Sequence, residues 1–180
     1  VGKLDGITRG NHEQRIWRAV GIDPLEHIAD DLGVPYAAHA MLLVYHVGDQ
    51  EYRTFVRHGT GNGASTVGSQ ANQLERAARV MEADIYLTGH THTQLAFPRD
   101  DFRLRDAQSN TPLVRSYLRD GGRAFTYPAD RVERAKMLFV SSGSFLAYEP
   151  YAAERGFAPA NIGAPRVFMD GRRFDTHASV

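Results

Sequence analysis

Apolar residues recur at helical spacing in two short stretches near the start of the chain. The apolar positions are Ile16 and Val20 in the first stretch and Leu25, Ile28 and Leu32 in the second. Intervals of three and four residues place such side chains on one side of a helix. The pattern predicts helices over residues 13–20 and 24–33, with their apolar sides and Trp17 in the core. Pro24 suits the first turn of the second helix and Gly33 its end.

Short apolar runs bounded by turn residues follow, and they predict strands. The predicted strands cover residues 4–8, 39–47, 51–58, 84–89, 93–100 and 136–146, and residues 166–174 are predicted to form a last strand or a hairpin. Gly48 and Asp49 separate two of these runs and predict a hairpin. A third helix is predicted over residues 69–83, with Ser69 as its cap. Helices alternate with strands early and strands dominate late, so we expect an α/β fold with a mixed β-sheet flanked by helices.

Length and composition limit the classes of function. A chain of 180 residues is enough for a single domain, which the patterns divide into an α/β part (1–98) and a β-rich part (99–180). Basic and acidic residues balance at 21 each, which makes a nucleic-acid substrate a less favoured option. The absence of cysteine excludes disulfides and thiolate metal sites and favours a cytoplasmic protein. No apolar run approaches the roughly 18 residues of a membrane span.

Three polar clusters each follow a predicted strand. They are the Gly-Asn-His-Glu string at residues 10–13, the Val-Arg-His-Gly string at 56–59 and the Gly-His-Thr-His string at 89–92. Ligands of open α/β sheets gather at the carboxyl ends of strands, so the clusters are expected to converge. Imidazole nitrogen and amide oxygen together suit borderline or hard divalent metals. Each histidine alone is better explained as a structural residue, but the ordered set favours a metal site.

In this order, the three strings resemble the calcineurin-like metallophosphoesterase family. Members of that family bind two metals and hydrolyse phosphomonoesters or phosphodiesters. The stretches "GHTHTQLAF" and "FVSSGSFL" resemble, more weakly, its phage- and plasmid-type branch. The resemblance covers residues 4–145 and implies a metallophosphoesterase-like sandwich of mixed β-sheet with flanking helices.

The resemblance also implies roles for individual residues. Asn11, His58 and His90 would bind one divalent ion and His92 the other, with manganese favoured over iron, zinc and nickel. A hydroxide held between the ions would attack phosphorus, and His12 would protonate the leaving oxygen. Arg15 and Arg57 are weaker candidates for binding the phosphate of the substrate, since a guanidinium matches phosphate geometry.

The family's first two motifs, Asp-x-His and Gly-Asp-x-x-Asp, do not precede Gly10. We therefore expect the fold to be incomplete at its N-terminus, with the remaining ligands supplied by a missing N-terminal segment or a second chain. Residues 175–177 spell Asp-Thr-His, which raises the alternative of a circular permutation, although no Gly-Asp-x-x-Asp follows. A further alternative is a truncated or degenerate, non-catalytic domain that binds a partner or phosphate.

Overall fold

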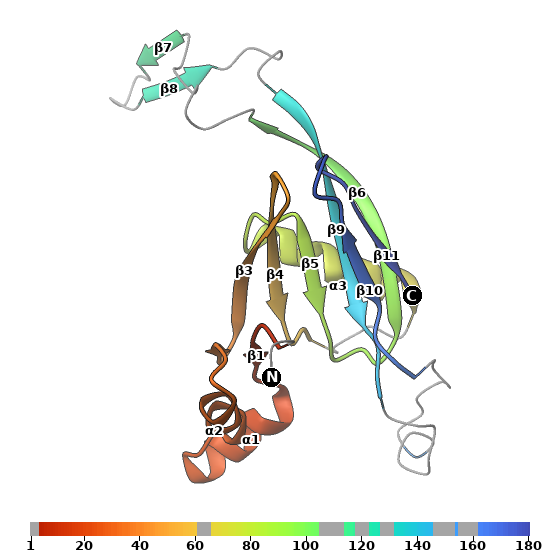
Figure 1. Ribbon diagram of the computed structural model, residues 1–180. Coiled ribbons are helices and arrows are strands. Elements are labelled where there is room, and N and C mark those ends of the chain that lie inside the picture. Colours follow the sequence, from red (N-terminus) through yellow and green to blue (C-terminus); the bar gives the residue numbers. More distant parts are fainter. Residues whose placement is uncertain are drawn as a thin grey trace. The chain divides into compact units, whose positions relative to one another are not determined.

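The computed structural model describes residues 4–60, 66–104, 114–117, 123–126, 132–145, 154 and 162–180. Within these ranges the protein is an α/β protein with three α-helices, a five-stranded mixed sheet and smaller two-stranded sheets (Figure 1). The predicted α/β class is thus confirmed. The chain divides into two compact units, residues 1–98 with 137–180 and residues 99–136. None of the described helices combines the length and apolarity needed to cross a bilayer.

Most of the predicted helices and strands are present, but β2 and β11 lie outside the predicted segments, and the third helix ends earlier than the predicted residue 83. The helices are α1 (Asn11–Val20), α2 (Pro24–Leu32) and α3 (Val67–Glu75), and a 3₁₀ helix, η1 (Arg76–Arg79), continues α3. The strands are β1 (Ile7–Thr8), β2 (Tyr36–Ala37), β3 (Ala40–Val47), β4 (Gln50–Arg57), β5 (Ile85–Thr88), β6 (Gln94–Leu104), β7 (Val114–Tyr117), β8 (Arg123–Thr126), β9 (Val132–Ser142), β10 (Arg166–Met169) and β11 (Thr176–Ser179). Residues 61–65, between β4 and α3, lie outside the described residues.

The five-stranded sheet has the order β3-β4-β5-β9-β6. Its first two strands form the predicted antiparallel hairpin around Gly48 and Asp49. By contrast, β4, β5 and β9 run parallel to one another. Arg57, the last residue of β4, pairs with Thr88, the last residue of β5. The segments that follow these two strands therefore begin side by side at one edge of the sheet.

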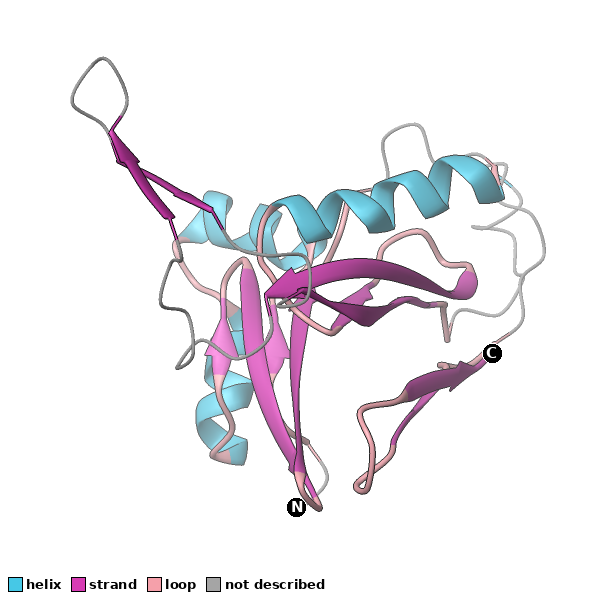
Figure 2. Cartoon of the chain, turned by 90° about the horizontal axis from the view of Figure 1, so that it is seen from above, coloured by secondary structure: helices cyan, strands magenta, loops and turns pink. Residues whose placement is uncertain are grey.

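The central strands of the sheet are covered on both faces, and their alternate residues point to opposite sides. On one face Phe55, Tyr86 and Phe139 pack against Leu74 of α3 and Ala77 of η1. The β10–β11 hairpin packs on the other face, as Figure 2 shows from above. That second cluster consists of Tyr52, Ile85, Leu138 and Val140, with Val167, Met169 and Ala178 against it.

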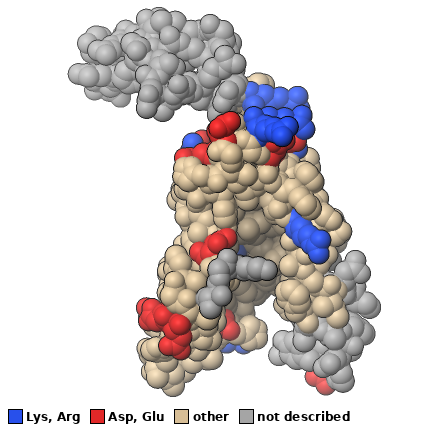
Figure 3. Space-filling view, in the orientation of Figure 1, with Lys and Arg blue, Asp and Glu red and all other residues tan. Residues whose placement is uncertain are grey.

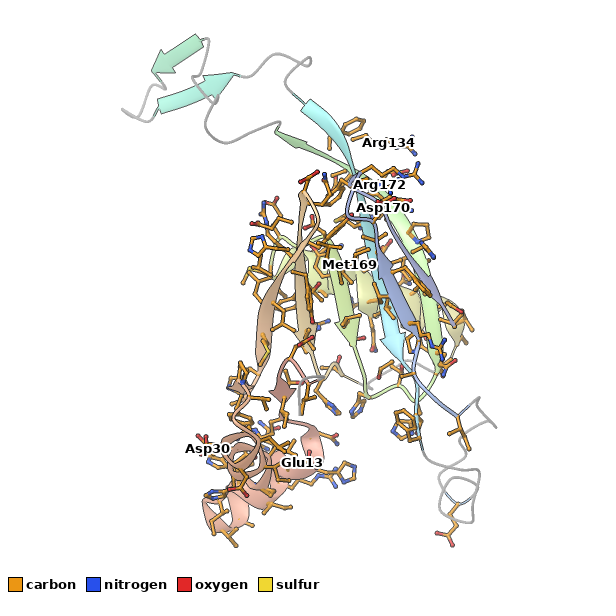
Figure 4. All side chains as sticks on the ribbon, in the orientation of Figure 1. Glu13, Asp30, Arg134, Met169, Asp170 and Arg172 are labelled. Carbon is orange, nitrogen blue, oxygen red and sulfur yellow. The ribbon has the colours of Figure 1, made fainter. Side chains whose placement is uncertain are left out.

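Hydrogen bonds to Tyr52 of β4 hold the turn between β10 and β11. The Tyr52 hydroxyl lies 2.7 Å from the Asp170 carbonyl oxygen, and it accepts a hydrogen bond from the Asp175 N–H at 3.0 Å. The turn itself closes through the Arg172 N–H, which donates to the Asp170 carboxylate at 2.8 Å (Figure 4). The C-terminal hairpin is thus fixed near the beginning of β4.

The first two helices differ most from the prediction. Neither is a core helix: α1 has no buried residue, and Ala29 is the buried residue of α2. Trp17 and Ile16 are each 46% exposed, and Ile28 is equally exposed, so the predicted burial of these sides was wrong. The nearby β1–β2 ladder pairs only residues 7–8 with 36–37. Such a short ladder offers little sheet surface for two helices to cover in the described part of the chain.

Helix starts also differ in detail. α1 begins at Asn11, two residues before the predicted start, and its cap Gly10 makes no side-chain hydrogen bond. The cap of α3 is Thr66 rather than Ser69. Thr66 accepts from the Ser69 N–H, and the Ser69 hydroxyl lies 3.1 Å from the Thr66 N–H, so the two residues form a reciprocal capping box.

Candidate metal centre

Two of the predicted ligands follow directly from adjacent parallel strands. His58 comes after β4 and His90 lies two residues beyond β5. The His58 Nε2 atom lies 2.9 Å from the His90 Nδ1 atom, and the two rings are almost perpendicular, at 87°. The carboxyl edge of the sheet therefore brings together side chains that are 32 residues apart in sequence.

Asn11 reaches the same point from a different element. It is the first residue of α1, and its Oδ1 atom lies 2.9 Å from His58 Nε2. An added Cβ at Gly10 would lie 3.2 Å from the His58 ring, so the chain passes close to that imidazole at the helix start. The structure thus brings Asn11, His58 and His90 together, as the spacing of the polar clusters predicts.

The three side chains present three electron-pair donors to one region. A neutral imidazole nitrogen carries either one proton or one lone pair. His58 Nε2 lies 2.9 Å from both Asn11 Oδ1 and His90 Nδ1. A single proton on this nitrogen could be donated to only one of these two atoms. A cation bound at about 2.1 Å from each ligand places neighbouring ligand atoms about 3 Å apart, so the contacts fit a shared ion. An amide oxygen with two imidazoles suits the divalent metals proposed from the sequence.

Burial and neighbouring histidines keep these imidazoles neutral. Burial lowers the pKa of His58, and His90 lowers it further, while the nearby Glu13 carboxylate acts in the opposite sense. The pKa of His90 is also lowered, first by burial and then by His92 and His12. Neutral imidazoles keep a lone pair at physiological pH, which is the form that binds metals.

The loops that carry His58 and His90 are joined through their backbones. The Gly89 N–H donates to the His58 carbonyl at 3.0 Å. A Cβ at Gly59 would lie 3.0 Å from the Gly89 carbonyl oxygen, so the two loops touch closely there. Thr91 is tied to β9, with its hydroxyl 3.0 Å from that of Ser141. His90 and His92 have φ angles of 72° and 58°, a left-handed conformation that is uncommon outside glycine.

His12 and His92 lie next to the three converging side chains. His12 is exposed in the first turn of α1, and His92 is partly buried. Both are near enough to lower the pKa of His58 and His90. Glu13 was not among the predicted site residues, although it is part of the Gly-Asn-His-Glu string. Its carboxylate lies close to Gly10 and is near enough to His58 to raise the pKa of that imidazole. Figure 4 shows Glu13 on α1.

The two predicted phosphate-binding arginines lie in different places. Arg57 is half-buried, its pKa lowered by burial, and its Nη2 donates to the Gln73 carbonyl at 3.3 Å. With Arg9, Asn11 and His58 it lines a pocket of about 230 Å³. Arg15 is exposed on α1 and does not line this pocket. The structure therefore brings Arg57, but not Arg15, next to the converging ligands.

The circular permutation considered above requires Asp175 near His58. Asp175 instead lies at Tyr52, six residues before His58 along β4. That separation corresponds to about 20 Å of extended strand. His177 is not in a ligand position there, since its ring stacks on Phe168 at 4.7 Å. The structure gives no support to the permuted order.

No three His, Cys, Asp or Glu side chains of the described residues form a group suited to a metal ion. The candidate centre therefore depends on the Asn11 amide as its third donor. Comparisons of the chain with protein-family models, with curated proteins and with solved structures find no match. Functional inference consequently rests on the residues themselves and on the geometry of this site.

Proposed function

We propose that the protein is a metal-dependent phosphoesterase of the calcineurin-like kind, acting on a phosphomonoester or phosphodiester, with two divalent ions that would activate water for attack on phosphorus. The observation that carries the proposal is the convergence of Asn11, His58 and His90, with contacts of 2.9 Å around His58 Nε2. The order of the motifs along the chain supports it, as does the resemblance to the phage- and plasmid-type branch of that family. The fold would then be an incomplete metallophosphoesterase-like sandwich.

In this proposal different residues of the chain have different roles. Asn11, His58 and His90 hold one ion, and His92 is a ligand of the second. Two bound ions supply an activated water and neutralise charge on the phosphoryl oxygens, with manganese favoured. His12, exposed beside the ligands, donates a proton to the departing oxygen of the ester. Arg57 stays a candidate for contact with the phosphate from the adjoining pocket.

The ligand set is incomplete for two ions. Its described donors are neutral, and carboxylates usually complete such dinuclear sites. We propose that a further N-terminal segment or a second chain supplies them. On the face shown in Figure 3, few charged side chains lie over the five-stranded sheet. Among the described residues, that face shows no extended basic surface of the kind on which non-specific nucleic-acid binding depends, so nucleic acid stays a less favoured substrate.

The test is Mn²⁺ binding and phosphatase turnover by the 180-residue chain and by His58→Ala and His90→Ala. The control is His46→Ala, whose side chain is 75% exposed on β3. We expect Mn²⁺ affinity to fall at least tenfold in the two site variants and to stay unchanged in the control. Chelator-sensitive hydrolysis of aryl phosphate monoesters or diesters would confirm the activity. Unchanged Mn²⁺ affinity in both site variants would show that the convergence is structural.

A second candidate is a non-catalytic domain that binds phosphate or a partner. It is favoured by the lack of any metal-suited group of three His, Cys, Asp or Glu among the described residues. This candidate predicts that the chain binds inorganic phosphate without turnover and that chelation leaves the affinity unchanged. Any hydrolysis that is lost with a chelator and restored with Mn²⁺ excludes it.

A further inference from the structure

Arg9 stands at the centre of a buried polar cluster just before the Gly10–Asn11 turn. Its Nη1 donates to Asp23 Oδ2 at 3.1 Å, and the two side chains are only 7% and 2% exposed. The Tyr36 hydroxyl donates to the same carboxylate oxygen, and the Leu25 N–H donates to the other at 3.1 Å. The cluster therefore ties the end of β1 to the start of α2 and to β2. We call Arg9, Asp23, Tyr36 and Trp17 the Arg9 cluster.

The cluster is ionised at neutral pH despite its burial. Burial alone would raise the pKa of Asp23, but hydrogen bonds from Tyr36, the Leu25 backbone and Arg9 outweigh it, and the pKa is lowered. A buried arginine–carboxylate pair adds little net stability compared with apolar residues of the same size. The pair does fix the orientation of the Arg9 side chain, because a guanidinium and a carboxylate form hydrogen bonds in a defined geometry.

Trp17 connects this cluster to α1. The guanidinium carbon of Arg9 lies 5.0 Å from the centre of the Trp17 ring, within the range of a cation–π contact. None of the ten residues of α1 is buried, so apolar packing contributes little to the placement of this helix. The Arg9–Trp17 contact and the Asn11–His58 contact link α1 to the rest of the described chain through side chains.

We propose that Arg9 is a positioning residue which, by stacking on Trp17, holds the first turn of α1 so that Asn11 Oδ1 stays beside His58 Nε2. The inference rests on the proposed function, because Asn11 is there a metal ligand. The role of Arg9 does not itself depend on a bound metal, because the Arg9–Trp17 contact, rather than apolar packing, sets the position of Asn11. Loss of the contact would loosen α1 as a body and move Asn11 without touching it.

The experiment compares Trp17→Ala with Ile16→Ala in the full 180-residue chain. Replacing Arg9 itself would leave the Asp23 carboxylate buried without its cation and endanger the fold. Trp17 and Ile16 are neighbours on α1, and both are 46% exposed, so the control removes an apolar side chain of the same fractional exposure, although a smaller one. Only Trp17 of this pair makes the stacking contact with Arg9. Circular dichroism would establish that both variants keep the wild-type fold.

Two readouts separate positioning from metal binding. The first is the metal-free NMR signals of the Asn11 side-chain amide and the His58 ring. The second is Mn²⁺ affinity by calorimetry. We expect Trp17→Ala to shift both sets of signals and to weaken Mn²⁺ binding about tenfold, with Ile16→Ala doing neither.

The experiment distinguishes failure of the positioning role from failure of the proposed function. If both variants leave the NMR signals and Mn²⁺ affinity at wild-type values, or change them alike, the positioning role is overturned and the proposed function stands. If no form of the chain binds Mn²⁺ but Trp17→Ala alone shifts the Asn11 and His58 signals, the proposed function fails and the positioning role stands.

Discussion

Replacement of Gly59 by alanine should disturb both the stability of the chain and its candidate metal centre. Gly59 has a φ of 90°, and a Cβ there would lie 3.0 Å from the Gly89 carbonyl oxygen. The left-handed backbone costs alanine about 1–2 kcal/mol. The collision with a backbone atom, which moves less readily than a side chain, adds about 1–2 kcal/mol. We therefore expect a loss of about 3 kcal/mol, a large share of the stability of a domain this size.

Gly33→Ala is the matched control. Gly33 has a φ of 65° at the end of α2, and a Cβ there would meet nothing within 4 Å. The control thus carries the same cost of the left-handed backbone, about 1–2 kcal/mol, without the collision. Urea unfolding would measure both losses of free energy. Because Gly59 and Gly89 are the neighbours of His58 and His90, Gly59→Ala alone should also lower Mn²⁺ affinity, about tenfold. Equal losses of stability in the two variants, with Mn²⁺ affinity unchanged, would refute the reasoning.

Three further predictions concern the core and the dependence on pH. Phe139 is fully buried between Tyr86 and Phe97, with ring centres 4.8 Å and 5.2 Å away, so Phe139→Ala should cost about 3–5 kcal/mol in urea unfolding. Burial, the hydrogen bond to Asp23 and the charge of Asp23 raise the pKa of Tyr36 to about 12. The unfolded chain releases this proton near pH 10, so stability should decline between pH 10 and 12, and Tyr36→Phe should reduce that decline. The lowered pKa values of His58 and His90 mean that protons compete with metal only in acid. Mn²⁺ affinity measured by calorimetry should therefore stay level from pH 8 to about 6.5 and fall below that; a fall beginning above pH 7 would contradict the assignment.

The sequence predicted most of the strands because their signals are local. The β3–β4 hairpin follows from two short runs rich in apolar residues on either side of Gly48 and Asp49, and β5 from a short apolar run ending at Gly89. The proximity of His58 and His90 could also be predicted from the sequence, since adjacent parallel strands end at a common edge of the sheet. These predictions needed only periodicity and one rule of sheet topology.

Other features depend on information that no local pattern contains. Helical spacing predicts an apolar side, but not whether a partner surface exists, and so the burial of Trp17 was predicted wrongly. The early start of α1 was missed because its cap, Gly10, has no side chain that could signal it. Arg9 and Asp23 are 14 residues apart and belong to no periodic pattern, so their pairing emerges only from the fold.

The left-handed backbone at His90 and His92 has a consequence for how this loop would respond to selection. Glycine adopts such angles freely and asparagine tolerates them, whereas histidine is strained by of order 1 kcal/mol at each position. A library randomised at both positions and screened for folding alone should therefore enrich glycine and asparagine. The same library screened for Mn²⁺ binding, which the proposed function requires, should return histidine. The difference between the two outcomes would measure, position by position, how much stability the chain gives up to keep an imidazole in this loop.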